Sequence, residues 1–275
     1  MPELPEVETI VRGLRPGLVK RSIQRVCILW PDVVRQSPRG FSAGLRGRTV
    51  ESVTRRGKNI VIVLTEERVL VVNLGMTGRL LLTGRAALAT HPAVRFTLDQ
   101  PPALVFDDVR RFGSLEVLTV GDWARRSGAL GPEPLSANYT AAQLYHGLSR
   151  SVSPIRSWLL DQRHVAGVGN IYANEALYRA GIHPRRPAKS VREAEVRALH
   201  RAIRQVLRKA IENRGTTLRD YRDASGSPGE NAVALRVYGR AGEPCLNCST
   251  GVRRLVFGNR SAFYCPSCQP EKRRV

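Results

Sequence analysis

The first half of the chain consists of short apolar runs rich in Val, Ile and Leu, separated by Gly, Pro, Asn or charged residues. Runs of this length and composition are typical of β-strands. Because no helical period lies between them, they indicate an antiparallel sandwich or barrel and not a doubly wound sheet. Eight strands are expected, over residues 22–30, 49–55, 59–64, 68–74, 79–82, 94–98, 103–106 and 114–118.

A helical period is found on both sides of this region. Apolar residues at positions 7, 10, 11, 14 and 18 predict a first helix, with Pro5 in its first turn. Residues 130–134 break the strand pattern, and beyond them helices are expected over 140–148 and 154–160. A third should start at an Asn170 N-cap and stop at Gly181, and a longer one should run from a Ser190–Glu193 capping box to Gly215. We expect the arginines on the polar face of the longer helix to be solvated.

The charge of the chain narrows the class of partner. Its 44 Lys and Arg residues outnumber 23 Asp and Glu residues, which gives a formal net charge of +21. Such a field favours a polyanion, and the planar guanidinium suits phosphate, although a merely soluble basic protein is the alternative. The sequence contains neither an apolar run of about 18 residues, which could span a membrane, nor a secretory signal. We therefore expect a cytosolic protein without a membrane partner.

Four of the five cysteines have the spacing of a zinc ribbon. Two Cys-x-x-Cys pairs, Cys245 with Cys248 and Cys265 with Cys268, are separated by sixteen residues. Four thiolates leave no open coordination position, so one structural Zn²⁺ is predicted; two disulfides fit poorly with a cytosolic chain. Cys27 lies in an apolar run and is expected in the core.

The N-terminal residues offer a candidate nucleophile. If an initiator methionine is removed, Pro2 becomes a secondary amine with an unperturbed pKa of roughly 7.7–8.0, which can attack an aldehyde carbon and form an iminium. Glu3 beside it could carry a proton. The alternative is that this stretch only marks the start of a helix.

Three further segments have side chains or backbone suited to nucleic acid. Met76 at a glycine turn could be an exposed wedge or a core residue, and residues 110–113 bring an arginine and an aromatic ring to a strand edge. The Gly167–Asn170 turn before a helix could bind an anion, although an ordinary helix start explains it equally well. Arginines between the cysteine pairs, Arg260 among them, suit a DNA groove.

Taken together, these motifs closely resemble those of the formamidopyrimidine-DNA glycosylase family. The matching segments run through nearly the whole chain: Pro2-Glu3-Leu4-Pro5-Glu6-Val7-Glu8, Arg56-Gly57-Lys58, Leu74-Gly75-Met76-Thr77-Gly78, Arg110-Arg111-Phe112-Gly113, Leu130-Gly131-Pro132-Glu133-Pro134-Leu135, Gly167-Val168-Gly169-Asn170-Ile171-Tyr172, Val237-Tyr238-Gly239-Arg240 and the cysteine pairs. The resemblance implies an α+β protein with three parts. These are a catalytic β-sandwich with a flanking helix (1–130), a helix–two-turn–helix domain (131–239) and a zinc-finger hairpin (240–275).

The resemblance also implies a function. It is base-excision repair of duplex DNA by a monomeric, bifunctional glycosylase and abasic-site lyase that removes oxidised purines such as 8-oxoguanine and formamidopyrimidines. By the same resemblance Pro2, Glu3 and Lys58 are catalytic. Met76, Arg110 and Phe112 would fill the gap left by an extruded base, while Asn170 and Arg260 would grip phosphates.

Departures from the family pattern affect lesion preference more than they affect activity. Asn73 stands where histidine is common, Arg156 where lysine is common, and the 226–234 loop lacks an aromatic residue. The sister type that prefers oxidised pyrimidines usually begins Pro-Glu-Gly-Pro-Glu, so Leu4 favours the purine enzyme. A non-catalytic zinc-ribbon DNA-binding protein is the rival from another class, but it would need no amine at Pro2.

Overall fold

The computed structural model describes residues 2–84 and 88–271, which fall into two compact units. The sandwich unit comprises Met1–Ala129 and Ile211–Ala232, and the helical unit comprises Leu130–Ala210 and Val233–Val275. The predicted division at 130 and 239 stays a prediction. The compact units divide the chain differently, because 211–232 belongs with the N-terminal part.

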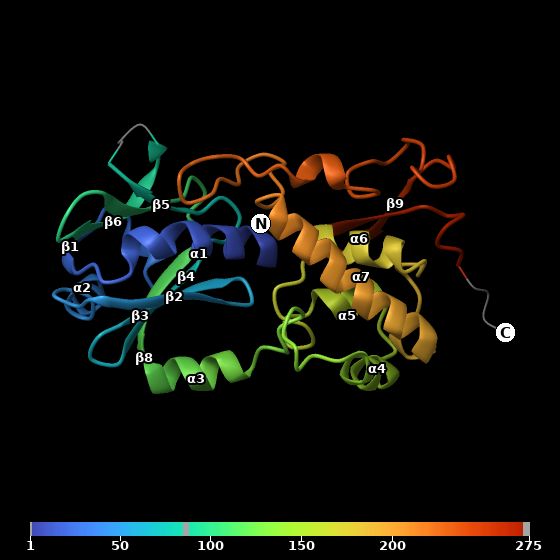
Figure 1. The fold of residues 1–275 in the computed structure, drawn as a ribbon, viewed down its shortest axis with the longest axis horizontal. Helices are drawn as coiled ribbons and strands as arrows, with labels where there is room; N and C mark the ends of the chain where they lie inside the picture. The colour runs from blue at the N-terminus through green and yellow to red at the C-terminus, as the bar shows by residue number, and fades with distance from the viewer. Residues whose placement is uncertain (1, 85–87, 272–275) are drawn as a thin grey trace. The chain divides into compact units, whose positions relative to one another are not determined.

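Two four-stranded antiparallel sheets form the sandwich unit (Figure 1). One has the order β1-β6-β7-β5 and the other the order β2-β3-β4-β8. The strands are β1 (Ile23–Ile28), β2 (Val50–Arg56), β3 (Asn59–Leu64), β4 (Arg68–Asn73), β5 (Arg79–Thr83), β6 (Pro92–Leu98), β7 (Ala103–Asp107) and β8 (Ser114–Thr119). The eight predicted strands and the antiparallel sandwich are therefore confirmed. Cys27 is only half-buried, contrary to the prediction, because β1 is an edge strand.

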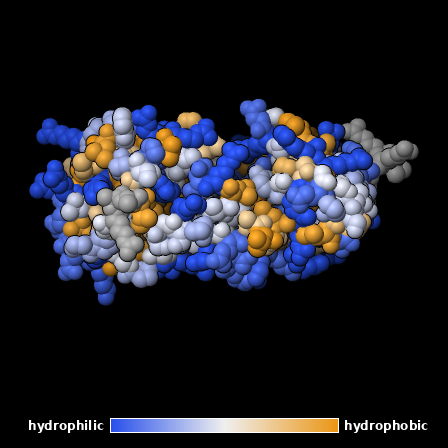
Figure 2. Space-filling model, turned by 90° about the horizontal axis from the view of Figure 1, so that it is seen from above, coloured by the Kyte–Doolittle hydropathy of each residue, from blue (hydrophilic) through white to orange (hydrophobic). Residues whose placement is uncertain are grey.

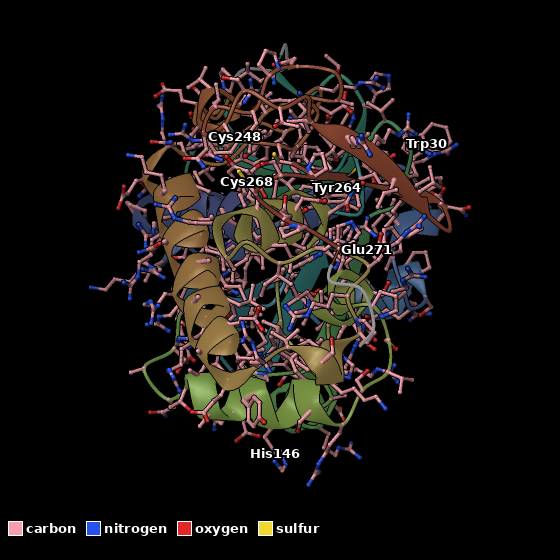
Figure 3. All side chains as sticks on the ribbon, turned by 90° about the vertical axis from the view of Figure 1, so that its right-hand side faces the viewer. Trp30, His146, Cys248, Tyr264, Cys268 and Glu271 are labelled. Carbon is pink, nitrogen blue, oxygen red and sulfur yellow. The ribbon has the colours of Figure 1, made fainter. Side chains whose placement is uncertain are left out.

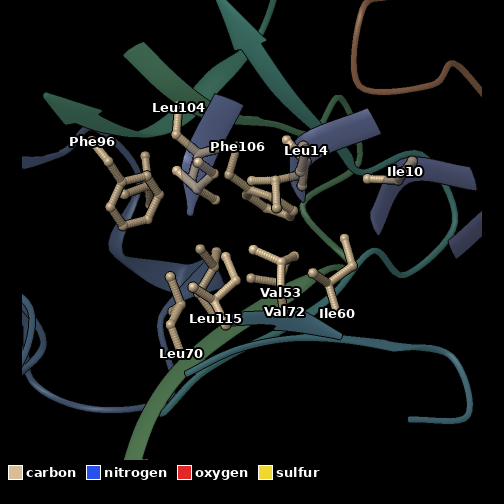
Figure 4. Packing of buried hydrophobic residues seen from close by; sticks show 14 of the residues in the cluster. Ile10, Leu14, Val53, Ile60, Leu70, Val72, Phe96, Leu104, Phe106 and Leu115 are labelled. Atoms are coloured by element: carbon tan, nitrogen blue, oxygen red, sulfur yellow. The ribbon is translucent and has the colours of Figure 1, made fainter. Parts of the chain in front are cut away.

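Helix α1 (Leu4–Leu18) packs against β2 and β5, one strand from each sheet, and closes one end of the core. Its apolar residues at 7, 10, 11, 14 and 18 are all fully buried, as their helical spacing predicted. Figure 4 shows Ile10 and Leu14 near Phe106 of one sheet and Val53 and Ile60 of the other. Burying apolar area on this scale is the main stabilising contribution to the unit.

The sandwich unit also contains two helices that its sequence pattern did not indicate. Helix α2 (Pro38–Ala43) has one turn and a half and buries Phe41. Helix α3 (Val120–Gly128) has no fully buried residue, so no apolar stripe marks it. Its Trp123 packs on the outer face of the second sheet, against Val61, Val69 and Val71. Both faces of β3 and β4 are therefore covered, which explains their continuous apolar sequences.

The helical unit contains α4 (Ala141–Ser149), α5 (Ile155–Leu160), α6 (Asn170–Arg179) and most of α7 (Glu193–Glu212). A two-stranded hairpin of β9 (Arg253–Phe257) and β10 (Arg260–Tyr264) follows. The four predicted helices are confirmed, and Gly181 follows α6 with a φ of +68°.

The predicted starts of two helices, α6 and α7, are wrong. The prediction that the arginines of α7 are all solvated is also wrong. Gly169 is the N-cap of α6, and Asn170 is its first helical residue, which frees the Asn170 side chain for other bonds. The Ser190 hydroxyl donates to the Pro187 carbonyl, and it is Glu195 that accepts the Arg192 N–H at the start of α7. The Arg204 guanidinium is half-buried and donates to the Pro134 and Ser136 carbonyls, since a long side chain can reach the preceding loop.

Across the described residues, no helix combines the length and the apolar character needed to cross a membrane. Figure 2 shows one face of the molecule, on which hydrophilic residues are widespread and hydrophobic residues form scattered patches.

Candidate functional site

The start of α1 places Pro2 and Glu3 at the positive end of a rigid helix. Glu3 is the N-cap of α1 and is 3% exposed, and Pro2 is also buried. The Glu3 N–H donates to Glu6 Oε2 at 2.8 Å, which fixes the backbone beside Pro2. Helix N-termini carry a partial positive charge, so a developing negative charge is stabilised here.

Glu6 links this start to the returning segment of the sandwich unit. Its buried side chain accepts the Thr216 N–H at Oε1, also at 2.8 Å. Gly215 has a φ of +84°, and a Cβ there would come within 3.1 Å of Glu6 Cγ and 3.0 Å of the Tyr221 ring. The Tyr221 hydroxyl donates to the Arg214 carbonyl, and burial raises the pKa of this phenol. None of these supports was predicted from the sequence, because Glu6 and Thr216 are 210 positions apart.

Lys58 and Asn73 lie at the same end of the second sheet. Lys58 is half-buried in the two-residue turn between β2 and β3, where Gly57 has a φ of +58°. Asn59, the next residue, pairs with Asn73 of β4, and the Asn73 amide donates to Asn59 Oδ1 at 3.0 Å. Asn73 Oδ1 also accepts the Gly75 N–H at 3.0 Å. The residue that replaces the usual histidine thus shapes the turn that carries Met76.

Met76, Arg110 and Phe112 form one exposed group, which we call the wedge group. Met76 is 44% exposed and Phe112 is 55% exposed, so the alternative of a core methionine is excluded. Arg110 Nη1 lies 3.5 Å from Met76 Sδ, and its guanidinium carbon lies 4.5 Å from the centre of the Phe112 ring. The structure therefore brings together three residues from two loops. Neighbouring Arg111 instead stacks on Trp30, at 4.6 Å from that ring centre.

In the helical unit, Asn170 lies beside the turn of the β9–β10 hairpin. Its Nδ2 donates to the Ser261 carbonyl at 3.1 Å, next to Arg260. Arg156, which is 1% exposed, donates from Nη2 to Asn170 Oδ1 at 2.5 Å and to the Ser261 carbonyl at 3.0 Å. Burial, and then repulsion from Arg260, lowers the pKa of Arg156 to about 10. The guanidinium groups of Arg156 and Arg260 thus concentrate positive charge near Asn170, which suits an anion.

The four predicted metal ligands converge at the other end of the hairpin. The sulfurs of Cys245, Cys248, Cys265 and Cys268 all lie within 4.8 Å of one another. Two of them, Cys248 and Cys268, are labelled in Figure 3. Zn–S bonds of about 2.3 Å in a tetrahedron fit such a separation, so the donor set fits one Zn²⁺ ion. The Tyr178 hydroxyl lies 3.2 Å from Cys245 Sγ and is placed to support that ligand.

Helix α6 fixes the hairpin through side chains that sequence analysis did not single out. Asn174 Oδ1 accepts the Phe263 N–H at 2.8 Å. The Glu175 carboxylate accepts the N–H groups of Arg236, Val237 and Tyr238 at 2.9, 3.0 and 2.9 Å. Burial raises the pKa of Glu175, and these three bonds oppose that shift. The same helix therefore presents Asn170 and anchors the cysteine-bearing segment.

An antiparallel β-sandwich with a helix at its end, a helical unit and a four-cysteine metal site together define a zinc-finger protein of α+β class. Three family models match in order. They are the formamidopyrimidine-DNA glycosylase N-terminal domain over residues 1–115, its H2TH domain over 130–222, and the zinc finger found in FPG and IleRS over 242–270.

Known proteins match over nearly the full length. A formamidopyrimidine-DNA glycosylase of Chloroflexus aggregans is 44% identical over 272 residues, which is 98% of each chain. The MutM (Fpg) crystal structure from Thermus thermophilus has a TM-score of 0.89 and 42% identity, over 98% of this chain and 100% of that one. Lactococcus lactis Fpg, 31% identical with the same coverage, superposes with a TM-score of 0.91 in a mutant complex with Fapy-dG DNA and 0.90 in a complex with abasic-site DNA.

The chain belongs to the formamidopyrimidine-DNA glycosylase family. It is a DNA-repair glycosylase with a zinc finger, and both the resemblance read from the sequence motifs and the zinc prediction are confirmed.

Proposed function

We propose that this protein is a bifunctional glycosylase and abasic-site lyase that removes oxidised purines from duplex DNA with the Pro2 amine as nucleophile. The observation that carries the proposal is the start of α1. There Pro2 and Glu3 are buried, and the Glu3 N–H donates to the Glu6 carboxylate. The same carboxylate also accepts the Thr216 N–H. Glu3 and Glu6 form a capping box, in which each side chain accepts the other's backbone N–H, so the helix start accounts for the buried Glu3 carboxylate. The capping box does not require a proline at position 2, where removal of Met1 would leave a secondary amine beside that carboxylate.

In the proposed reaction, the unprotonated Pro2 nitrogen bonds to C1′ of the damaged nucleotide, and the bond from C1′ to the base breaks. The departing base takes the electron pair and a proton. Glu3 moves protons at the sugar as the ring opens, and the product is a Pro2 iminium at C1′. Lys58, in the β2–β3 turn, assists and contacts the DNA.

The iminium makes the neighbouring C2′ proton acidic. Loss of that proton breaks the C3′–O bond and releases the 3′ phosphate, and a second elimination releases the 5′ phosphate. Hydrolysis then frees Pro2. These steps require Met1 to be absent, since a proline inside the chain has no amine to offer.

The DNA-binding side chains divide into two roles. The wedge group would fill the gap left by the extruded base, because extrusion costs a few kcal/mol of stacking and pairing. Asn170 and Arg260 would hold phosphates of the DNA, and Arg156 adds positive charge beside them. Complexes of Lactococcus lactis Fpg with Fapy-dG DNA and with abasic-site DNA support an oxidised-purine substrate and a lyase step. We further propose that the enzyme acts as a monomer in the bacterial cytosol.

Borohydride trapping tests the proposal. The full chain, with its N-terminus determined by mass spectrometry, is incubated with duplexes carrying one 8-oxoguanine, one formamidopyrimidine or one oxidised pyrimidine. An adduct with the purine lesions that maps to Pro2 is expected. The matched control is the same chain with an uncleaved N-terminal extension, which converts Pro2 to an amide and should bind without trapping.

Other outcomes would select the rivals. An adduct with the pyrimidine lesion alone would identify the sister specificity. Tight lesion binding without any adduct, from a chain shown to begin at Pro2, would refute the lyase mechanism and favour a binding protein.

A further inference from the structure

Asp108, at the end of β7, is a buried carboxylate to which the proposed mechanism assigns no role. It is 1% exposed. Its Oδ1 accepts the Thr77 hydroxyl at 2.5 Å and the Arg110 N–H at 3.3 Å, and its Oδ2 accepts the Gly113 N–H at 2.8 Å. The donors belong to two different loops, so a single side chain ties the turn after β4 to the loop before β8.

The two loops that Asp108 joins are the ones that carry the wedge group. Thr77 follows Met76 directly, and Arg110 and Gly113 enclose the segment that holds Phe112. The loops also touch. Gly75 has a φ of +58°, and a Cβ there would lie 2.5 Å from the Phe112 carbonyl carbon. The exposed contacts among Met76, Arg110 and Phe112 therefore rest on a buried layer with Asp108 at its centre.

We propose that Asp108 is a positioning residue for the wedge group, which it assembles before DNA arrives. The proposal rests on the proposed function of Met76, Arg110 and Phe112. An ionised carboxylate is acceptor-only. Here Oδ1 holds the Thr77 hydroxyl from the turn after β4, and the two oxygens together hold the Arg110 and Gly113 N–H groups of the loop before β8, so the two loops are ordered together. Groups that are already ordered lose less conformational entropy on insertion, which lowers the barrier to base extrusion.

Asp107 provides a matched control one residue away. It is 0% exposed and also accepts several hydrogen bonds, from Arg79 Nε at 3.0 Å and from the His91 N–H at 2.5 Å. Arg79 is the first residue of β5 and His91 directly precedes β6, so both partners lie outside the turn and loop that carry the wedge group. Asp107→Asn therefore perturbs the buried carboxylate next to Asp108, at the last residue of β7, without removing an acceptor from the two loops.

Asp108→Asn is the direct test, because an amide keeps one acceptor oxygen and turns an NH₂ group toward a donor. The full-length variant is mixed by stopped flow with a duplex that holds a tetrahydrofuran abasic-site analogue opposite 2-aminopurine. The slow fluorescence phase, which reports insertion at the gap, should slow by at least about tenfold while initial binding changes by less than about threefold; tenfold corresponds to about 1.4 kcal/mol of barrier.

Further variants separate this proposal from its premise. Thr77→Val removes one donor and should slow the same phase, which keeps the test open if Asp108→Asn fails to fold. If Phe112→Ala slows insertion but Asp108→Asn and Thr77→Val do not, Asp108 has no positioning role. If Asp107→Asn slows insertion as strongly as Asp108→Asn, the effect is general destabilisation and the proposal is wrong. If Phe112→Ala has no effect, the wedge assignment itself fails, and the proposal fails with it.

Discussion

Replacing Glu175 by alanine should loosen the zinc-bearing part of the helical unit although the residue is not a metal ligand. The side chain accepts the backbone N–H groups of Arg236, Val237 and Tyr238. Val237 is fully buried and Tyr238 is half-buried. Val237 packs in one cluster with Cys245, Val252 and Cys265, so its position determines how the first cysteine pair meets the second.

The magnitude follows from these bonds. A hydrogen bond to a charged acceptor contributes about 1.5–3 kcal/mol, and two of the three donors would be left without water or a partner. The buried carboxylate is itself costly to desolvate, as its raised pKa shows. Replacing Glu175 by alanine removes this cost as well as the three hydrogen bonds. The net loss should therefore be smaller than the sum of two bonds, about 2–4 kcal/mol in the unfolding transition that releases zinc.

Zinc release measured with a chromogenic chelator during urea unfolding is the appropriate assay. Glu175→Ala should lower the urea midpoint and accelerate zinc release. Glu175→Gln keeps one acceptor oxygen, so its midpoint and release rate should lie between those of Glu175→Ala and those of the parent protein. The control is Glu193→Ala, which removes the same charge from an exposed position paired with Arg197. Equal midpoints and release rates for Glu175→Ala and Glu193→Ala would refute the reasoning.

The remaining predictions concern catalysis, metal, salt and pH. Pro2→Gly should abolish most strand cleavage while lesion binding stays within about threefold by gel shift, a change of less than 1 kcal/mol; equal loss of both would make the residue structural. Cys265→Ser, or zinc removal by a chelator, should unfold the finger and eliminate DNA binding, and an unchanged binding isotherm would take the finger out of the interface. Binding measured by fluorescence anisotropy should weaken steeply with salt, with a slope of about −0.9 per phosphate neutralised, and a flat dependence would contradict phosphate binding. The hydrogen bonds from Arg186 lower the pKa of Glu195. The Arg186–Glu195 pair therefore stabilises the fold above the ordinary glutamate pKa, and this contribution is lost as pH falls below about 4.3. The thermal unfolding temperature of Glu195→Gln should accordingly be less sensitive to acid than that of the parent protein.

The sequence predicted best those features that depend on nearby residues. Strand positions came from apolar runs between turn residues, and α1 came from five apolar positions on one stripe. Helix α3 could not be found in this way, because it buries no residue fully and only Trp123 marks its contact with the sheet.

The supports of the candidate site depend on distant partners instead. Glu6 accepts from Thr216, and Glu175 from residues about sixty positions away. The hydrogen bond that gives Asp108 its proposed role comes from Thr77, 31 positions earlier in the chain. A single sequence shows that such carboxylates exist, but only the fold shows what each one holds. The exception is the cysteine set, whose spacing alone defined the ligands.

Because residues 211–232 belong to the sandwich unit, the ribosome completes this unit only after it has synthesised most of the helical unit. Glu6 meets its Thr216 donor only after the ribosome has added 210 further residues, although α1 stands at the start of the unit. Until then the first turn of α1 has its own capping box, but the Glu6 carboxylate lacks the Thr216 bond that anchors it to the rest of the unit. A chain truncated near residue 210 would keep the eight strands but lose Tyr221 and Ala224 from their core, and Glu6 would lack its Thr216 donor. Translation thus separates the assembly of the strands from the completion of the turn that carries Pro2, the proposed nucleophile.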